Sequence, residues 1–572
     1  MRSLCVEMAR PWPGLQFPDG TFPDYLHGDL APRSTRYGEA MLGYGLLGTG
    51  LREADSETID AGLRALRWFV RQTDLQRDHP SVFAHAAVAS AYNLARREAA
   101  SRPLFAGARD DWERWLRRVR LLWLPATTHY ANKYLVEAVA VLELLDAELE
   151  AGATGTVLDQ RADARRRAEH LVNEHVPALA ERGAFAVGDK RAYFLSDPEG
   201  GNPLAYQGLS FGMYARALAL LGATASEPAR TTLRLVGRAS WGLMGPDGDV
   251  AYAGRSQEQA WALALTAYGA EAAVELAGAS AAAHRPLARR ALTRLRDEHG
   301  TGPRGLFLTP SLREDLRDHG RGVDSYAGVI GYAGLTLVAA NWATDVRDED
   351  GAPPDAPPDA PLAARYALEP EKTGFAVVRR PRLWFAVRTA AKTVADDLRY
   401  DFGLVALKAP RGDGRWGDVL RPRPYTHHGA DSAGPVLRRS AGPGLPAGER
   451  LAVAGDGTVV VHGGFRTLGG EWLRRGVAFR FEPDGDRVRL AFPTQRGDRF
   501  KFSAFFRAAG PRPRVTDHAI EGDGQRVGFN PSATVAFDDD VYASGRDARL
   551  IRANLFFPAS DGGPIHITVG PA

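Results

Sequence analysis

The feature that most constrains the fold is a change in the hydrophobic pattern of the sequence, which divides the chain at residues 345–364. This stretch, DVRDEDGAPPDAPPDAPLAA, is acidic and rich in proline, and it has few apolar side chains larger than alanine. A segment of this composition can bury little surface, so the sequence predicts an extended linker. Because the two sides of the linker are patterned differently, we expect two main domains built from different elements.

The part before the linker has helical periodicity almost throughout. Helices are predicted at 36–51, 56–72, 81–99, 109–121, 131–150, 161–180, 203–222, 228–242, 256–277, 282–298 and 323–343. Arginine-rich amphipathic runs alternate with more apolar runs, as a two-layer ring of helical hairpins requires. We therefore predict an incomplete (α/α) toroid over residues 36–344, preceded by an extended arm over residues 1–35.

The part after the linker consists of short β-branched and aromatic runs separated by Gly, Pro and Asp turns. The clearest runs are GFAVVRR, LWFAVRT, GTVVVHGGF, RGVAFRFEP, RVRLAFP, KFSAFFRA, ATVAFDD and PIHITVG. This pattern predicts antiparallel strands stacked as a β-sandwich over residues 365–572. The fold class expected for the whole chain is multidomain α+β.

The composition narrows the classes of function. A net charge of +3 over 572 residues argues against a dedicated nucleic-acid binder. The single cysteine, Cys5, excludes an intrachain disulfide and a cysteine-based zinc site. No signal peptide and no membrane-spanning run is visible, so we expect a cytoplasmic protein, or a secreted one if the start is truncated. We expect no cofactor and no membrane partner, and the oligomeric state is not predicted.

The stretch from Asn202 to Gly222 is the first candidate for chemistry. It predicts a helix with one buried apolar stripe, and Tyr206, Ser210 and Tyr214 follow a neighbouring stripe in steps of four residues. Two phenols and a hydroxyl in a row are unusual on a core helix. The alternative is that both tyrosines lie at the edge of the core with their hydroxyl groups in water.

Two further segments place polar side chains where an apolar helix begins. In the first, Asn132 lies in the first turn, where an amide and the helix N-terminus can bind a carboxylate; it could equally be a helix cap. In the second, GRSQEQAW, Arg255 stands beside a buried face and needs an anionic partner. That partner is either Glu258 or a bound substrate.

These segments resemble motifs of a known enzyme family. The run from Asn132 to Glu137 is similar to the asparagine–aromatic–aromatic–x–x–glutamate motif of the chondroitin AC/hyaluronate lyases. The run AYQG, which contains Tyr206 and is followed by Tyr214, resembles the helix with the catalytic tyrosine of that family, and Arg255 resembles its substrate-binding arginine. The layout of helices and strands is similar to that family and to the heparinase II/III-like lyases.

One departure concerns a histidine. In the hyaluronate lyases a histidine precedes the tyrosine by nine positions, where this chain has Ala205 or Asp197, depending on the tyrosine. The candidates that remain are His129, and His427 with His428 in a predicted loop of the β-domain, which resembles the histidine-containing loop of heparinase-like lyases.

The resemblance implies β-elimination at a uronic acid of an anionic polysaccharide or oligosaccharide, without a metal. In this reaction an amide and a cation neutralise the sugar carboxylate while a tyrosine serves as base and acid. The catalytic residues expected are Tyr206, Tyr214, Asn132, His129 and Arg255. The substrate-binding residues expected are Lys133, Tyr134, Gln207, Gln257, Glu258, Trp261, His427 and His428.

Two alternatives remain open from the residues alone. A glycoside hydrolase on an α/α-barrel would need two carboxylates, for which Asp197, Glu199, Glu258 and Asp324 are available. A non-catalytic glycan-binding protein is the other alternative, and it would not need a tyrosine positioned to transfer protons. The run from Asp247 to Asp249 resembles half of a calcium loop but is more simply explained as a turn.

Overall fold

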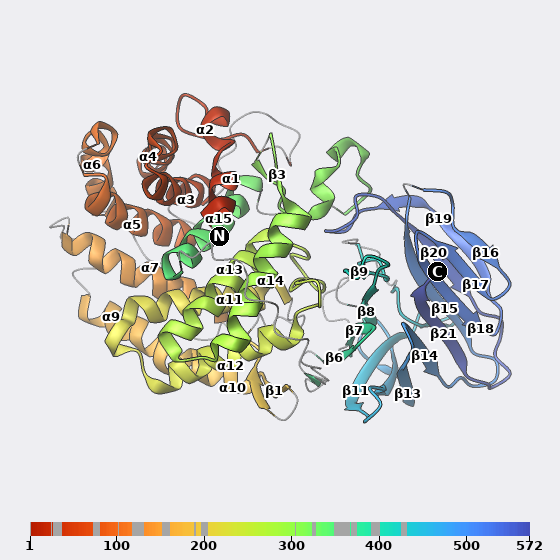
Figure 1. The fold of residues 1–572 in the computed structure, drawn as a ribbon. Coiled ribbons are helices and arrows are strands. Elements are labelled where there is room, and N and C mark those ends of the chain that lie inside the picture. The colour runs from red at the N-terminus through yellow and green to blue at the C-terminus, as the bar shows by residue number, and fades with distance from the viewer. Residues whose placement is uncertain are drawn as a thin grey trace.

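The computed structural model has a helical part and a strand-rich part, which lie side by side in Figure 1. The structure describes residues 2–24, 26, 37–72, 81–100, 102–116, 131–150, 161–187, 190–195, 204–303, 305–322, 328–347, 366–367, 374–389, 401–424, 432–508 and 510–572. The predicted linker falls almost entirely outside these residues. The helical toroid and the antiparallel sheets expected from the sequence are both present.

Six helices of the described residues form an inner layer whose side chains are buried on nearly all sides. They are α3 (Gly38–Glu53), α5 (Ser81–Glu98), α7 (Ala131–Glu150), α11 (Leu204–Leu221), α13 (Ala260–Ala277) and α15 (Val329–Val346). Consecutive members contact each other, and α15 packs against α3. The inner layer of the predicted toroid is therefore a closed ring of helices. Apolar as these helices are, none in the described part of the chain meets the length and hydropathy that crossing a bilayer demands.

The outer layer consists of amphipathic helices, each with one solvent-exposed face and one buried face. They are α4 (Ser56–Arg71), α6 (Pro103–Leu116), α9 (Arg161–His170), α10 (Val176–Arg182), α12 (Glu227–Leu243) and α14 (Ala281–Arg294), with π-helical turns at Leu171–His175 and Leu295–His299. Side-chain caps fix some of their starts, as when Ser226 Oγ accepts from Ala229 N at 3.3 Å. Because an outer helix leads the chain back after each inner one, the inner helices run in the same direction and begin at one end of the ring.

The N-terminal residues differ from the expected extended arm. Arg2–Ala9 forms helix α1 and Trp12–Leu15 forms helix α2. Helix α1 packs on α3 and α15 through its buried apolar side chains, and Cys5 Sγ lies 3.6 Å from Thr344 Oγ1. The prediction was wrong for these residues because their apolar spacing supports a helix once the ring offers a surface to cover.

The described residues of the strand-rich part form three sheets in which every pairing is antiparallel. In spatial order, the first sheet consists of β5 (Tyr366–Ala367), β6 (Phe375–Arg380), β7 (Leu383–Arg388), β8 (Gly403–Pro410) and β9 (Trp416–Asp418). The second consists of β10 (Val436–Arg438), β15 (Arg499–Arg507), β20 (Leu550–Phe556) and β19 (Thr534–Tyr542). The third consists of β11 (Leu445–Val453), β12 (Val459–Arg466), β13 (Trp472–Asp484), β14 (Arg487–Phe492), β21 (Ile565–Pro571), β18 (Gln525–Asn530), β17 (Ala519–Gly522) and β16 (Arg514–Thr516). Two small hairpins, β1 (Ala184–Val187) with β2 (Lys190–Tyr193) and β3 (Thr301–Gly302) with β4 (Gly305–Leu306), belong to the helical part.

The first sheet joins the two parts because both of its faces are buried. Strand β7 is buried at every residue. Phe385 belongs to the core shared with the other two sheets, whereas Trp384 packs toward the helical part and meets Tyr252 edge-on with ring centroids 5.1 Å apart. An apolar interface of this kind fixes the position of the sheets relative to the toroid.

Candidate functional site

The first turns of the inner helices meet at one end of the ring, which we call the N-terminal end of the ring. Tyr37, just before α3, stacks on Phe83 of α5 with ring centroids 5.3 Å apart. On α11, α13 and α15, Tyr206 meets Trp261 at 5.7 Å, and Trp261 meets Tyr332 at 5.9 Å. Aromatic side chains from the first turns of α11, α13 and α15 are thereby in contact at this end.

Tyr206 occupies the first turn of α11 and is 7% exposed. Its ring lies edge-on to Trp261, with an angle of 81° between the ring planes. The close approach of α11 to α13 requires a glycine: a Cβ at Gly208 would stand 2.7 Å from the Ala262 carbonyl oxygen. Tyr206 is therefore held by packing in a defined place at the N-terminal end of the ring.

Arg255 lies beside Tyr206, with its guanidinium carbon 6.0 Å from the centre of the phenol ring. It stands in the loop of residues 250–259 and not on a helix, because α13 begins only at Ala260. The loop is tied to the tyrosine helix, since Leu204 N donates to Ala253 O at 3.2 Å. A guanidinium at this distance from the face of a phenol ring attracts it through a cation–π interaction.

The predicted helix start at residue 256 was wrong, and backbone conformation explains why. Ser256 and Glu258 have φ of 58° and 59°, in the left-handed region that non-glycine residues rarely adopt. Gln257 Nε2 donates to Tyr252 O at 2.9 Å, and Glu258 N donates to Ala251 O at 3.0 Å. The loop is thus folded back on itself, and such strain is typical of functional loops.

Asn132 is the second residue of α7, the inner helix next to α11 in the ring. Its side chain is 5% exposed, and within the described part of the chain its buried Oδ1 accepts no hydrogen bond. A buried amide atom without a partner is costly in the folded protein, and it is available to a ligand. Asn132 therefore differs from a helix cap, whose side-chain oxygen would bind the backbone.

Tyr214, two turns further along α11 than Tyr206, does not belong to the same region. It is fully buried, and its hydroxyl donates to Val172 O in the outer layer at 3.0 Å. Burial raises the pKa of this phenol far above its usual value. We therefore correct its assignment from a catalytic residue to a packing residue of the toroid.

Tyr134 and the two glutamines expected to bind substrate are engaged with the protein. Tyr134 packs edge-on against His175 of the outer layer, with centroids 4.6 Å apart. Gln207 Oε1 accepts from Leu195 N at 2.6 Å while its amide nitrogen faces acceptors on β2 and α12. Together with the internal bond of Gln257, these contacts make all three residues structural.

Glu258 and Trp261 also differ from their expected role, whereas Lys133 is partly exposed in the first turn of α7. Glu258 Oε2 binds Arg294 at 2.8 Å, so its carboxylate has an internal cation that is not Arg255. Trp261 is 2% exposed and packs edge-on against Tyr206. His129, His427 and His428 lie outside the described residues, as do three of the carboxylates considered for hydrolysis: Asp197, Glu199 and Asp324.

Two ionisable side chains at the N-terminal end of the ring escaped the sequence analysis. Glu39, in the first turn of α3, is fully buried, and burial raises its pKa to about 8. His85, in the second turn of α5, is 1% exposed, and burial lowers its pKa to about 4. The signal that could have found them is the one used for Asn132: a polar residue near the start of an otherwise apolar helix.

The raised pKa of Glu39 predicts a specific dependence of stability on pH. Because the folded state keeps the proton up to about pH 8 and the unfolded state releases it near the ordinary glutamate pKa of 4.5, the free energy of unfolding falls as pH rises through this window. Between pH 5.5 and 8 the wild type should lose about 3 kcal/mol relative to Glu39→Gln, whose side chain stays neutral. Urea unfolding of both proteins at the two pH values measures this difference, and a constant difference would contradict the burial argument.

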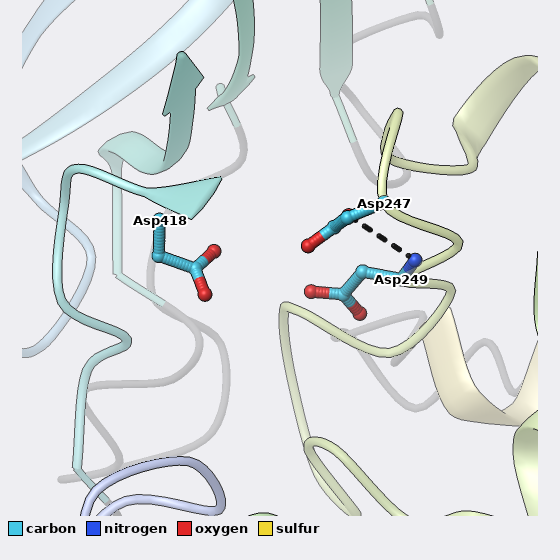
Figure 2. A group of neighbouring side chains, drawn as sticks. All are labelled: Asp247, Asp249 and Asp418. Atoms are coloured by element: carbon cyan, nitrogen blue, oxygen red, sulfur yellow. Dashed lines mark hydrogen bonds between the residues drawn. The ribbon is translucent and has the colours of Figure 1, made fainter. Parts of the chain in front are cut away.

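Three aspartates lie close together where the two parts of the chain meet. Figure 2 shows Asp247 and Asp249 on one turn of the helical part, facing Asp418 of β9, and a carboxylate oxygen of each lies within 4.8 Å of the others. Lys408 Nζ lies among them, 2.8 Å from Asp247 Oδ2 and 3.1 Å from Asp249 Oδ2. The ammonium group supplies the positive charge that a metal ion would bring, and the Asp247–Asp249 segment is a turn that binds an internal cation.

Comparisons with known proteins give structural matches of low identity. A heparan sulfate lyase, HepC, from Pedobacter heparinus is 10% identical with a TM-score of 0.32, over 90% of this chain and 77% of that one. A glycosyl hydrolase of family 88 from Bacteroides vulgatus is 11% identical with a TM-score of 0.38, over 60% of this chain and 98% of that one. The GH76A α-1,6-mannanase from Salegentibacter sp. HEL1_6 is 10% identical with a TM-score of 0.40, over 60% and 99%.

No protein-family model matches the sequence, and no curated protein matches it. At these identities and TM-scores, the function has to be argued from this chain's own side chains. Those that the structure brings together are Tyr206, Arg255 and Trp261, with Asn132 on the adjacent inner helix at the same end.

Proposed function

We propose that this protein is a glycan-processing enzyme, and more specifically a lyase that cleaves a uronate-containing polysaccharide or oligosaccharide by β-elimination. The observation that supports it most is the guanidinium of Arg255 beside the ring of Tyr206, on a helix adjacent to the one with Asn132. A phenol, a cation and an unsatisfied amide are the three groups that this reaction needs.

The proposal assigns Asn132 and Arg255 to the sugar carboxylate. The C5 proton of a uronic acid is poorly acidic because its removal places a second negative charge beside the carboxylate. Hydrogen bonds from the amide and charge from the guanidinium stabilise that charge as it develops. A half-turn of the amide exchanges its oxygen and nitrogen, so the unsatisfied position of Asn132 suits a donor as well as an acceptor.

The proposal assigns the proton transfers to Tyr206. Its phenolate removes the C5 proton, the electrons of the C5–H bond form the C4–C5 double bond, and the C4–O bond to the leaving sugar breaks. The proton then passes from Tyr206 to the leaving oxygen, which restores the phenolate. Arg255 makes this cycle easier because a nearby positive charge lowers the pKa of a phenol. His129, His427 and His428 remain candidates for a supporting role.

Hydrolysis is the second candidate, and Glu39 is the observation that favours it. A buried carboxyl group with a pKa of about 8 keeps its proton at neutral pH, as a general acid must. Hydrolysis also needs a second carboxylate across the bond. Glu258 is unsuitable because Arg294 already binds it.

One assay separates these functions. The protein is incubated with a panel of uronate polymers while the ultraviolet absorbance of the conjugated double bond and the reducing ends are followed. Growth of both signals supports the lyase. New reducing ends without absorbance indicate a hydrolase, and binding without either signal indicates a glycan-binding protein.

The proposed reaction should survive removal of divalent metal ions. Charge neutralisation is assigned to Asn132 and Arg255, and Lys408 lies among the carboxylates of the Asp247–Asp249–Asp418 group. Dialysis against EDTA is therefore expected to change the elimination rate by less than about twofold, within the scatter of such measurements. A loss restored by one particular metal ion would contradict the assignment.

A further inference from the structure

A buried network of charges joins the helical part to the strand-rich part beneath the Arg255 loop, residues 250–259. The helical part contributes Asp247, Asp249, Glu258 and Arg294, and the strand-rich part contributes Lys408, Asp418 and Arg546. The side chain of Asp247 is 12% exposed and those of the other six are 7% exposed or less. Charges buried to this degree are held in place by their partners.

Glu258 is the member of this network that lies in the Arg255 loop. Its Oε2 is 2.8 Å from Arg294 Nη2 and 3.8 Å from Arg546 Nη1. Arg546 in turn binds Asp418 and lies 3.2 Å from Glu298 Oε2. A guanidinium of the β-domain therefore lies within ion-pair distance of the carboxylate three residues after Arg255, while Arg294 makes the hydrogen bond to that carboxylate.

The backbone of the β-domain also touches the loop. A Cβ at Gly545 would stand 2.5 Å from the Gln257 carbonyl oxygen and 2.9 Å from the Glu258 Cβ, so only glycine allows this approach. The same segment is anchored to the helical part, because Ser311 N donates to Gly545 O at 3.1 Å and Gly320 N donates to Ala548 O at 2.9 Å. Residues 543–548 thus form a clamp, the Arg546 clamp, over residues 257 and 258.

The loop needs such support because its backbone is strained. Ser256 and Glu258, on either side of Gln257, both have positive φ, a conformation that persists only where the surroundings enforce it. If the contacts on Glu258 were lost, the loop would relax toward ordinary backbone angles. The guanidinium of Arg255 would then leave its place beside Tyr206.

We propose that Arg546 is a positioning residue: it holds the Arg255 loop through Glu258, so that the β-domain sets the geometry of carboxylate recognition in the helical part. This inference rests on the proposed function for its effect on catalysis. The structural part of the inference, that the clamp supports the loop, depends only on the contacts of Glu258 and Gly545.

The first test is hydrogen exchange in the full-length protein. Arg546→Met removes the cation and keeps most of the side-chain volume, and the Glu258 amide, which donates to Ala251 O, should then exchange at least about tenfold faster. Arg546→Lys, which keeps the charge, should restore part of the protection. The matched control is Arg321→Met, which removes an exposed ion pair to Asp540 across the same junction and should leave the loop unchanged. Unchanged exchange in Arg546→Met would overturn the inference.

The second test is a double-mutant cycle on the elimination rate. If Arg546 acts through Arg255, Arg546→Met should lower kcat/KM about tenfold or more, and the double variant with Arg255→Ala should be no slower than Arg255→Ala alone. Losses that multiply would overturn the inference. If the wild-type protein cleaves no uronate polymer, the proposed function fails. The hydrogen-exchange test still shows whether the Arg546 clamp supports the Arg255 loop.

A milder variant covers the case in which Arg546→Met does not fold. Gly545→Ala removes no charge but pushes its methyl group against Gln257 O and Glu258. Faster exchange of the Glu258 amide in this variant, with the exchange of the ring helices unchanged, supports the clamp. Unchanged exchange in a folded Gly545→Ala protein counts against it.

Discussion

Replacing Tyr206 by phenylalanine is expected to lower kcat for elimination by about 10³-fold or more while the protein stays folded. The ring still fills its place against Trp261, so packing is kept, whereas the oxygen that transfers the proton is gone. General acid–base catalysis by one group contributes about 10²–10⁴-fold, and Tyr206 is assigned both transfers. Initial rates by double-bond absorbance at saturating substrate measure the effect.

Tyr214→Phe is the matched control for this experiment because it makes the same chemical change on the same helix. Its hydroxyl binds Val172 O inside the toroid, so its loss should cost about 1 kcal/mol of stability and change kcat by less than about twofold. Equal kcat losses in the two variants would mean that the helix as a whole, and not the phenol of Tyr206, supports the reaction.

Asn132→Ala is expected to lower kcat/KM by about 10²–10³-fold, the usual effect of removing one donor from a site that stabilises developing negative charge. The substrate carboxylate would lose the amide while Tyr206 and Arg255 stay in place. Asn132→Asp should be at least as severe, since it sets a negative charge against the carboxylate. Steady-state kinetics on the preferred uronate polymer measures both variants.

The stability of the Asn132 variants provides the control. Because the buried Oδ1 of Asn132 accepts no hydrogen bond from any described residue, Asn132→Ala should shift the unfolding free energy by less than about 1 kcal/mol. A variant that is strongly destabilised but fully active when folded would show that Asn132 is a structural residue, and the carboxylate assignment would fail with it.

Much of the fold could be predicted because hydrophobic periodicity reports burial directly. The start of α7 at Ala131 and the ends of α5 and α13 agree with the predicted helices to within one residue. Helix α1 was missed because its residues become helical by packing on a ring that the local sequence does not encode. The start of α13 was misplaced because contacts with Arg294 and the β-domain, far away in the chain, hold residues 256–259 in a strained loop.

The candidate site could be predicted only in part, for a related reason. Spacing places Tyr206 and Tyr214 on one helix, but two turns separate a residue at the N-terminal end of the ring from one that faces the outer layer. The sequence likewise cannot show that the side-chain oxygen of Gln207 accepts a hydrogen bond from the backbone N–H of Leu195, just after β2. The partners of Glu258 were beyond prediction because Arg546 lies in the other domain.

The most direct measurement of the central claim is the mass and absorbance of the products released from a uronate polymer. Elimination adds no water, so the lyase should release a non-reducing-end sugar that has a conjugated double bond and lacks the elements of one water molecule relative to a hydrolysis product. Saturated products that contain that water would contradict the account and assign the protein to the hydrolases.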